Sequence, residues 1–262
     1  MVLIFLLLSS IECNSNQKKE GELGATVSKP VEKISSSQDV EYGFNSEGEK
    51  VTFTTSDGIQ IVGTLFLAGK DYSPTVVCLH QWMSDRSSYN SISGKFLSKG
   101  INVLAIDMRG FGESTKKSTG EGVEPNRLAG ADIEAAVHFL EKQKSVDTKR
   151  IGILGASYGA SNAIIYASKN PEIRAVVLLS PGINYFNVLP TEDAVKVFSG
   201  RSLFCIASNE DLRSVEAVKK YQSIIQKNID IKFMDNLGHG TNMFKANADL
   251  ENEVVAFFEK KL

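Results

Sequence analysis

The chain has 262 residues, of which 42% are hydrophobic and 23% charged, and its formal net charge is −2. This length suits one large α/β domain, and the near-neutral charge argues against the basic surface of a nucleic-acid-binding protein. The sequence contains no internal repeat and no Cys/His cluster with metal-ligand spacing. We therefore expect neither a nucleic-acid partner nor a metal ion.

The N-terminal residues differ from the rest in composition. Residues 1–8 are almost wholly apolar, too short to span a bilayer but typical of the apolar core of a secretory signal. Cys13 follows, and then a polar stretch rich in Ser, Lys and Glu. This layout resembles a bacterial lipoprotein. The resemblance implies a signal-like segment (1–12), a lipid anchor at Cys13, a flexible tether (13–48) and attachment to the membrane of the cell envelope. The alternative is a cytoplasmic protein with an apolar start.

Apolar runs alternate with helical patterns from residue 49 onward, which predicts a single α/β domain over residues 49–262. The turn Ser56-Asp57-Gly58 joins two strand patterns into an antiparallel hairpin. Strands are predicted at residues 51–55, 59–67, 75–79, 101–106, 151–154, 174–179, 202–207 and 229–234, and helices at 88–98, 128–142, 160–169, 215–226 and 249–261. This order predicts a mostly parallel eight-stranded sheet with helices on both faces. Ligands of such sheets bind at the carboxyl ends of the strands.

The segment Gly155-Ala156-Ser157-Tyr158-Gly159 fits the G-x-S-x-G pattern between a predicted strand and a predicted helix. Glycines two residues before and after Ser157 remove the β-carbons that would clash in a tight strand-to-helix turn. The pattern predicts that Ser157 is a nucleophile at the N-terminus of a helix, where developing negative charge is favoured. The alternative is a Gly/Ser turn without chemistry.

A nucleophilic serine needs a general base, and the chain has three histidines. His138 lies inside a predicted helix. His80 ends a predicted strand, and we expect the residues after it to form part of the oxyanion hole. His239 lies in a loop of small residues after the last strand, so we predict that His239 is the base.

The acid partner of the base is expected in the loop after the preceding strand. Glu210 and Asp211 occupy this loop, and Asp193 is a more distant candidate. We choose Asp211, with Glu210 as the alternative, because Asp211 follows the strand end by a few residues. Its task would be to orient the imidazole and stabilise the imidazolium. A helix N-cap is the structural alternative for either carboxylate.

The oxyanion formed during serine catalysis needs backbone N–H donors. The residue after the nucleophile, Tyr158, would supply one, and Trp82, after the strand at 75–79, would supply the other. The Trp82 indole would line the acyl pocket or anchor the core.

These residues resemble the α/β-hydrolase superfamily over roughly residues 50–262. The resemblance rests on the order Ser157, Asp211, His239, on Leu79-His80, and on the glycine-rich Asp107-x-Arg109-Gly110-x-Gly112-x-Ser114. Only some twenty residues separate the strand ending near 180 from the strand at 202, so the chain looks most like lidless dienelactone-hydrolase-like or acyl-peptidase-like esterases. One departure is Gln81, where the family commonly has glycine; its side chain is expected to narrow the oxyanion hole or change its angle.

The resemblance implies the α/β-hydrolase fold without a large cap, and a serine hydrolase that cleaves carboxylic esters, or thioesters or amides, through an acyl-enzyme. The substrate would be a small acyl compound, and the chemistry requires no cofactor. The alternative is a non-catalytic envelope lipoprotein that uses the fold as a binding module.

Overall fold

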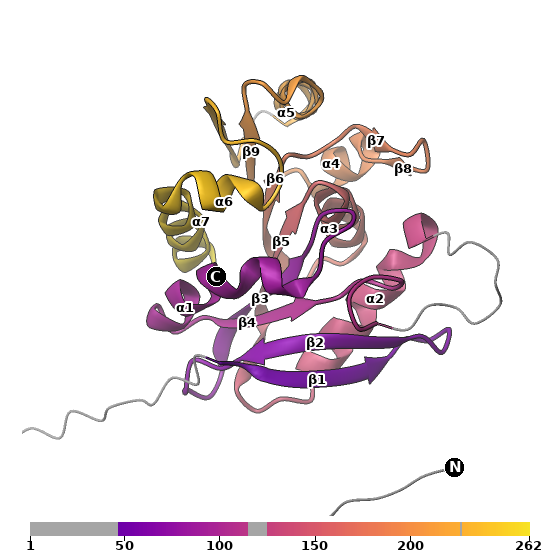
Figure 1. Ribbon diagram of the computed structural model, residues 1–262, viewed down its shortest axis with the longest axis vertical. Helices are drawn as coiled ribbons and strands as arrows, with labels where there is room; N and C mark the ends of the chain where they lie inside the picture. The colour runs from indigo at the N-terminus through magenta and orange to yellow at the C-terminus, as the bar shows by residue number, and fades with distance from the viewer. Residues whose placement is uncertain (1–46, 115–124, 226) are drawn as a thin grey trace, which may run out of the picture. The chain divides into compact units, whose positions relative to one another are not determined.

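The computed structural model describes residues 47–114, 125–225 and 227–262 of the chain. Its centre is an eight-stranded sheet with the strand order β1-β2-β4-β3-β5-β6-β9-β10 (Figure 1). The strands are β1 (Glu49–Thr54), β2 (Gln60–Phe66), β3 (Ser73–Leu79), β4 (Asn102–Ile106), β5 (Val146–Ala156), β6 (Ile173–Leu179), β9 (Ser202–Ser208) and β10 (Ile229–Met234). β2 pairs antiparallel with β1 and with β4, and the other neighbours pair in parallel. The predicted α/β fold, with a mostly parallel eight-stranded sheet and an antiparallel hairpin at its start, is confirmed.

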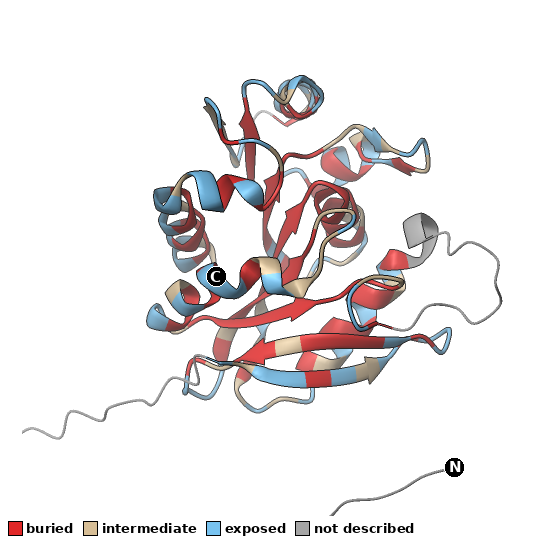
Figure 2. Ribbon diagram, viewed as in Figure 1, coloured by how far each residue is buried: buried red, intermediate tan, exposed pale blue. Residues whose placement is uncertain are grey.

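Helices cover both faces of the sheet, and each face has its own apolar layer (Figure 2). One layer contains buried residues of α2 (Pro125–Leu140), α3 (Tyr158–Lys169), α4 (Glu192–Phe198) and α5 (Leu212–Ile224). The opposite layer contains those of α1 (Asn90–Ser98), α6 (Asn242–Ala246) and α7 (Ala248–Lys261). Strands buried on both sides explain why the sequence shows continuous apolar runs rather than alternation.

Strand β3 illustrates how the two layers are built. Val77 and Leu79 belong to one layer, whereas Val76 and Cys78 belong to the other, because successive side chains of a strand point to opposite faces. Cys78 and Cys205 are buried free thiols in different layers, which confirms that they are core residues and not a disulfide.

The structure also contains elements that the sequence did not reveal. A 3-10 turn, η1 (Arg86–Tyr89), precedes α1, and β5 begins at Val146, earlier than expected. A two-stranded hairpin formed by β7 (Asn184–Tyr185) and β8 (Leu189–Pro190) follows β6, and then α4. Two-residue strands and helices of five to seven residues are too short to produce a recognisable hydrophobic period.

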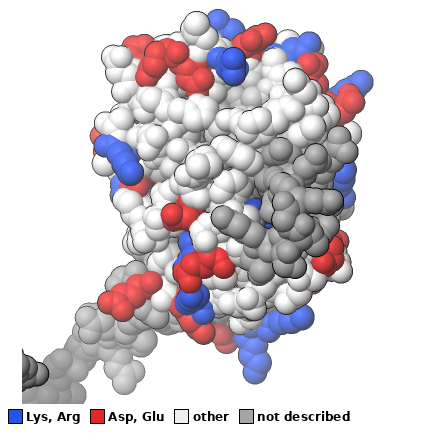
Figure 3. All heavy atoms as spheres, turned by 45° about the vertical axis from the view of Figure 1, so that its right-hand side comes forward, with Lys and Arg blue, Asp and Glu red and all other residues white. Residues whose placement is uncertain are grey.

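Charged side chains of both signs are interspersed on the face drawn in Figure 3, and uncharged side chains cover most of the described surface between them. In the part of the chain that the structure describes, no helix combines the length and the apolar character needed to cross a bilayer. Cys13, the signal-like segment 1–12 and the tether up to residue 46 lie outside the described residues.

Candidate active site

Ser157 lies on the turn between β5 and α3 with φ 53° and ψ −112°, a strained backbone for a residue with a side chain. The two flanking glycines make this turn possible. A β-carbon on Gly155 would come within 2.5 Å of the Gly159 carbonyl oxygen, and one on Gly159 would overlap the Leu79 carbonyl oxygen. The Ser157 N–H donates to the Leu179 carbonyl oxygen at 2.8 Å, which ties the turn to β6.

A continuous hydrogen-bond chain links the three residues that the sequence singled out. His239 Nε2 lies 2.6 Å from Ser157 Oγ, and His239 Nδ1 lies 2.6 Å from Asp211 Oδ2. The carboxylate can only accept at Nδ1, so the imidazole carries its proton there and Nε2 accepts the Ser157 hydroxyl hydrogen. This arrangement has the geometry of a nucleophile, a base and an orienting acid.

The two neighbouring carboxylates of the loop after β9 point to different targets. Asp211 caps α5, with Oδ1 3.4 Å from the Ser214 N–H, and reaches His239 with its other oxygen. Glu210 accepts hydrogen bonds from the backbone N–H groups of Asn236 (3.0 Å) and Gly238 (2.9 Å). Asp211 is thus both a helix cap and the partner of the imidazole, whereas Glu210 holds the loop that carries it.

The environment keeps the Asp211 carboxylate ionised. Burial by itself would raise the pKa of Asp211, but the hydrogen bonds from Ser214 and His239 outweigh it and lower the pKa below its ordinary value. For Glu210, hydrogen bonds led by the one with Ser208 lower the pKa to about 2. Both groups are therefore anionic at neutral pH.

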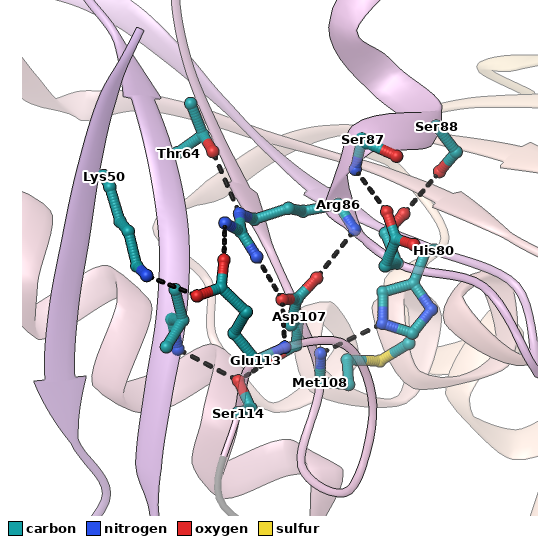
Figure 4. Close-up of polar contacts among 12 residues, drawn as sticks. Lys50, Thr64, His80, Arg86, Ser87, Ser88, Asp107, Met108, Glu113 and Ser114 are labelled. Carbon is teal, nitrogen blue, oxygen red and sulfur yellow. Dashed lines mark hydrogen bonds and ion pairs between the residues drawn. The ribbon is translucent and has the colours of Figure 1, made fainter. Parts of the chain in front are cut away.

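His80 is fully buried and does not contact Ser157; it organises the turn after β3 (Figure 4). Its Nε2 accepts from the Met108 N–H at 3.1 Å, so Nδ1 carries the proton and donates to the Gln81 carbonyl oxygen at 2.8 Å. Burial lowers the pKa of His80, which keeps the ring neutral. The Gln81 carbonyl and the Trp82 N–H belong to one trans peptide, so fixing the carbonyl also fixes the direction of that N–H.

The Gln81 side chain connects this turn to the histidine loop. Its Oε1 accepts from the Thr241 N–H at 2.8 Å and from the Thr241 hydroxyl at 3.3 Å. Gly240 lies under this contact with φ 60°, and a β-carbon there would overlap Gln81 Oε1. Gln81 and Gly240 are therefore matched in space although they are far apart in the sequence.

The third histidine, His138, is exposed on α2, and Asp193 is exposed on α4. Neither is among the residues that line the pocket beside His239. The structure thus brings Ser157, Asp211 and His239 together and leaves these two candidates outside.

The loop after β4 is fixed by ion pairs. Asp107 is fully buried and pairs with Arg86, which also pairs with Glu113 (Figure 4). Arg109 binds both carboxylate oxygens of the buried Asp132. Its backbone N–H donates to Oδ2 at 2.8 Å, and its side-chain Nε donates to Oδ1 at 2.7 Å. These bonds hold Met108, the donor to His80, in place.

An open pocket of about 790 Å³ adjoins His239 and Asp211. This volume lies within the range of small-molecule sites. Trp82, Tyr185 and Phe186 contribute aromatic rings to it, and Trp82 packs edge-on against Phe186 and Tyr158, with ring centroids 4.8 and 5.2 Å apart. The Trp82 indole thus both lines the pocket and packs against neighbouring rings.

Sequence reasoning missed Tyr185, whose hydroxyl contacts Ser157 Oγ. It lies on the short hairpin of β7 and β8, which has no sequence period that would reveal it. In the described residues, no group of three His, Cys, Asp or Glu side chains is placed to hold a metal ion.

The chain is similar to known proteins of one fold family. The profile of the alpha/beta hydrolase fold family matches residues 74–199. The chain is 31% identical over 133 residues to the thiohydrolase aneE of Aspergillus aculeatus, covering 50% of this chain and 41% of that protein. The chain spans about half the length of the curated relatives it matches.

Among solved structures, an esterase from Pyrococcus furiosus superposes with a TM-score of 0.68 at 25% identity, covering 85% of this chain and 94% of that one. A dienelactone hydrolase from Anabaena variabilis has a TM-score of 0.67 at 16% identity, covering 82% and 98%, which bears on the fold alone. Together with the strand order and the turn at Ser157, these matches show that the chain has the α/β-hydrolase fold and is similar to members of that superfamily.

Proposed function

We propose that this chain is a serine hydrolase that cleaves carboxylic esters of small acyl groups. The observation that carries the proposal is the hydrogen-bond chain from Asp211 through His239 to Ser157, with both contacts at 2.6 Å. The pocket of about 790 Å³ beside His239 and the similarity to an esterase support it.

In the proposed reaction, Ser157 Oγ attacks the carbonyl carbon while His239 Nε2 takes the hydroxyl proton. The carbonyl π pair becomes a lone pair on oxygen, which the N–H groups of Trp82 and Tyr158 stabilise. His239 then gives its proton to the departing alcohol. Water repeats the sequence on the acyl-enzyme and releases the acid. Asp211 keeps the proton of the neutral imidazole on Nδ1 and stabilises the imidazolium.

A thioester is the second candidate substrate, because a relative at 31% identity is a thiohydrolase. The same residues serve both reactions, and the leaving group alone differs. Turnover of an oxygen ester and a thioester with the same acyl group separates the two candidates: the better substrate has the higher kcat/KM.

The test is labelling of the folded protein with a fluorophosphonate, followed by mapping of the modified residue. We expect labelling at Ser157 in the wild type, none in Ser157→Ala, and a strong loss in His239→Ala. Ser168→Ala, near the other end of α3, is the matched control and should label like the wild type. Absence of labelling in a folded wild-type protein would contradict the proposal and favour a binding module.

Attachment to a membrane through Cys13 is a separate proposal that rests on the sequence alone. It predicts cleavage before Cys13 and a mass increase from acyl chains on that residue. Intact-mass analysis of the protein extracted from membranes tests it, and an unmodified chain that still begins at Met1 would contradict it.

A further inference from the structure

Tyr185 contacts the oxygen atom that the proposed function makes the nucleophile. Its hydroxyl meets Ser157 Oγ, the same atom that lies 2.6 Å from His239 Nε2. Tyr185 belongs to β7, whereas His239 belongs to the loop after β10. Two separate segments therefore converge on one serine oxygen.

Several contacts fix the Tyr185 ring in this position. The ring packs edge-on against Tyr158 and Phe186, with centroids 6.4 and 5.2 Å apart. Gly182 lies beneath it, where a β-carbon would come within 3.2 Å of the ring. The Tyr221 hydroxyl, from α5, donates to the Gly182 carbonyl oxygen at 2.8 Å and so anchors the base of the hairpin.

The tip of the hairpin is a tight turn. Phe186 and Asn187 have φ of 51° and 58°, in the left-handed region. Left-handed φ at consecutive central residues is typical of tight β-hairpin turns, and asparagine tolerates it well. Phe186 packs against Trp82 at a centroid distance of 4.8 Å, although it is half exposed. This packing holds the tip of the hairpin, next to Tyr185, in place.

The direction of the Tyr185 hydrogen bond follows from proton counting. Ser157 has one hydroxyl hydrogen, and His239 Nε2 accepts it because the imidazole proton is on Nδ1, facing Asp211. The Tyr185 hydroxyl must therefore donate its own hydrogen to Ser157 Oγ. An O–H donor thus points at the reacting atoms.

We infer that Tyr185 is a further catalytic residue, a side-chain donor to the oxyanion alongside the two backbone N–H groups. The inference rests on the proposed function. When Oγ bonds to the carbonyl carbon, the serine proton goes to His239 and the carbonyl π pair becomes a lone pair on oxygen. Oγ and that oxygen are then bonded to one carbon, so the oxyanion forms next to the atom that Tyr185 already contacts, and a short movement of the hydroxyl brings it to the oxyanion. Tyr185 moves its hydrogen bond to the oxyanion and keeps its proton.

Tyr185→Phe tests this inference because it removes the hydroxyl and keeps the ring. We expect kcat for a short p-nitrophenyl ester to fall about 100-fold, the lower end of the loss for one oxyanion donor. KM should change little, since the bond forms only in the transition state. Tyr72→Phe removes an exposed hydroxyl elsewhere and should leave kcat unchanged.

Binding of an alkylboronic acid provides a second measurement that does not depend on turnover. It forms a tetrahedral adduct on a reactive serine, and its Kd should rise in Tyr185→Phe and stay unchanged in Tyr72→Phe. Equal or faster turnover and labelling in Tyr185→Phe would overturn the inference, because the tyrosine would then only obstruct Ser157. In that case the fluorophosphonate would still label Ser157 in the wild-type protein. If instead the proposed function is wrong, the wild-type protein would not be labelled at all.

Discussion

Two loops that leave the sheet at the carboxyl ends of parallel strands differ in how they are held. The β4 loop (residues 107–114) is fixed by ion pairs of buried groups, in which Asp107 binds Arg86, and Arg109 binds Asp132. The β10 loop (residues 235–241) is held by backbone N–H groups that donate to side-chain oxygens. The His239 side chain on this loop is 42% exposed.

This difference matches the tasks that we propose for the two loops. Separating a buried ion pair leaves an uncompensated charge, so the β4 loop is locked and can fix His80 and the turn that carries the Trp82 N–H. The β10 loop carries His239, the proposed base, which in that role gains and loses a proton next to substrate and water. Because the donors in this loop are neutral and its surroundings are exposed, substrate and water can reach His239. Its two ring nitrogens meanwhile stay aligned with Ser157 and Asp211.

The largest effect is expected from Asp211→Asn, which breaks the alignment of the base without removing a loop. Loss of the orienting charge should lower kcat by about 10³–10⁴-fold. The control, Glu210→Gln, weakens the bonds to the β10 loop backbone and should lower kcat by less than about tenfold, since donors to an exposed carboxylate retain water as a partner. Ester hydrolysis by the two variants measures this, and a larger loss in Glu210→Gln would contradict the assignment.

The next effect concerns the stability of the β4 loop. Asp132→Ala removes the fully buried partner of Arg109, which keeps its ion pair with the exposed Asp57, and should lower the free energy of unfolding by at most about 3–5 kcal/mol. Glu259→Ala removes an exposed partner of Lys99 and should cost at most about 1 kcal/mol. Urea unfolding measures both, and equal costs would mean that the ion pairs of the β4 loop do not lock it.

A smaller effect is expected where the β10 loop meets Gln81. Gly240→Ala introduces a β-carbon at φ 60° that overlaps Gln81 Oε1, whereas Gly238→Ala, at φ 76°, meets no atom within 4 Å. The first variant should lose more stability than the second, by about 1–2 kcal/mol, and part of its loss should disappear when Gln81→Gly is added. Urea unfolding of the single and double variants tests the match, and additive losses would contradict it.

The smallest effect is a pH dependence of stability. The pKa of Asp211 lies below its unfolded value of about 3.9, so its carboxylate stabilises the fold above that pH, and this contribution is lost as pH falls through the folded pKa. The difference in unfolding free energy between wild type and Asp211→Asn should therefore be present at neutral pH and shrink in acid. Asp193→Asn, on exposed α4, is the control. A difference that grows in acid would contradict this sign.

The sequence by itself determined the sheet and the serine turn. Buried parallel strands need continuous apolar runs, and the turn at Ser157 needs glycine at 155 and 159, so both requirements are visible in a few consecutive residues. The same pattern of strands and loops predicted that Ser157, Asp211 and His239 each follow a strand, at the edge of the sheet where ligands bind.

Only the tertiary structure decided which side chains meet. Glu210 and Asp211 are adjacent in sequence, and their directions differ only because Asp211 caps α5 while Glu210 turns to the β10 loop. Gln81 meets Thr241 across 160 residues. Tyr185 reaches Ser157 from a hairpin of two-residue strands. A hydrophobic period records which face of an element is buried, whereas these contacts depend on how distant elements pack, which no local pattern encodes.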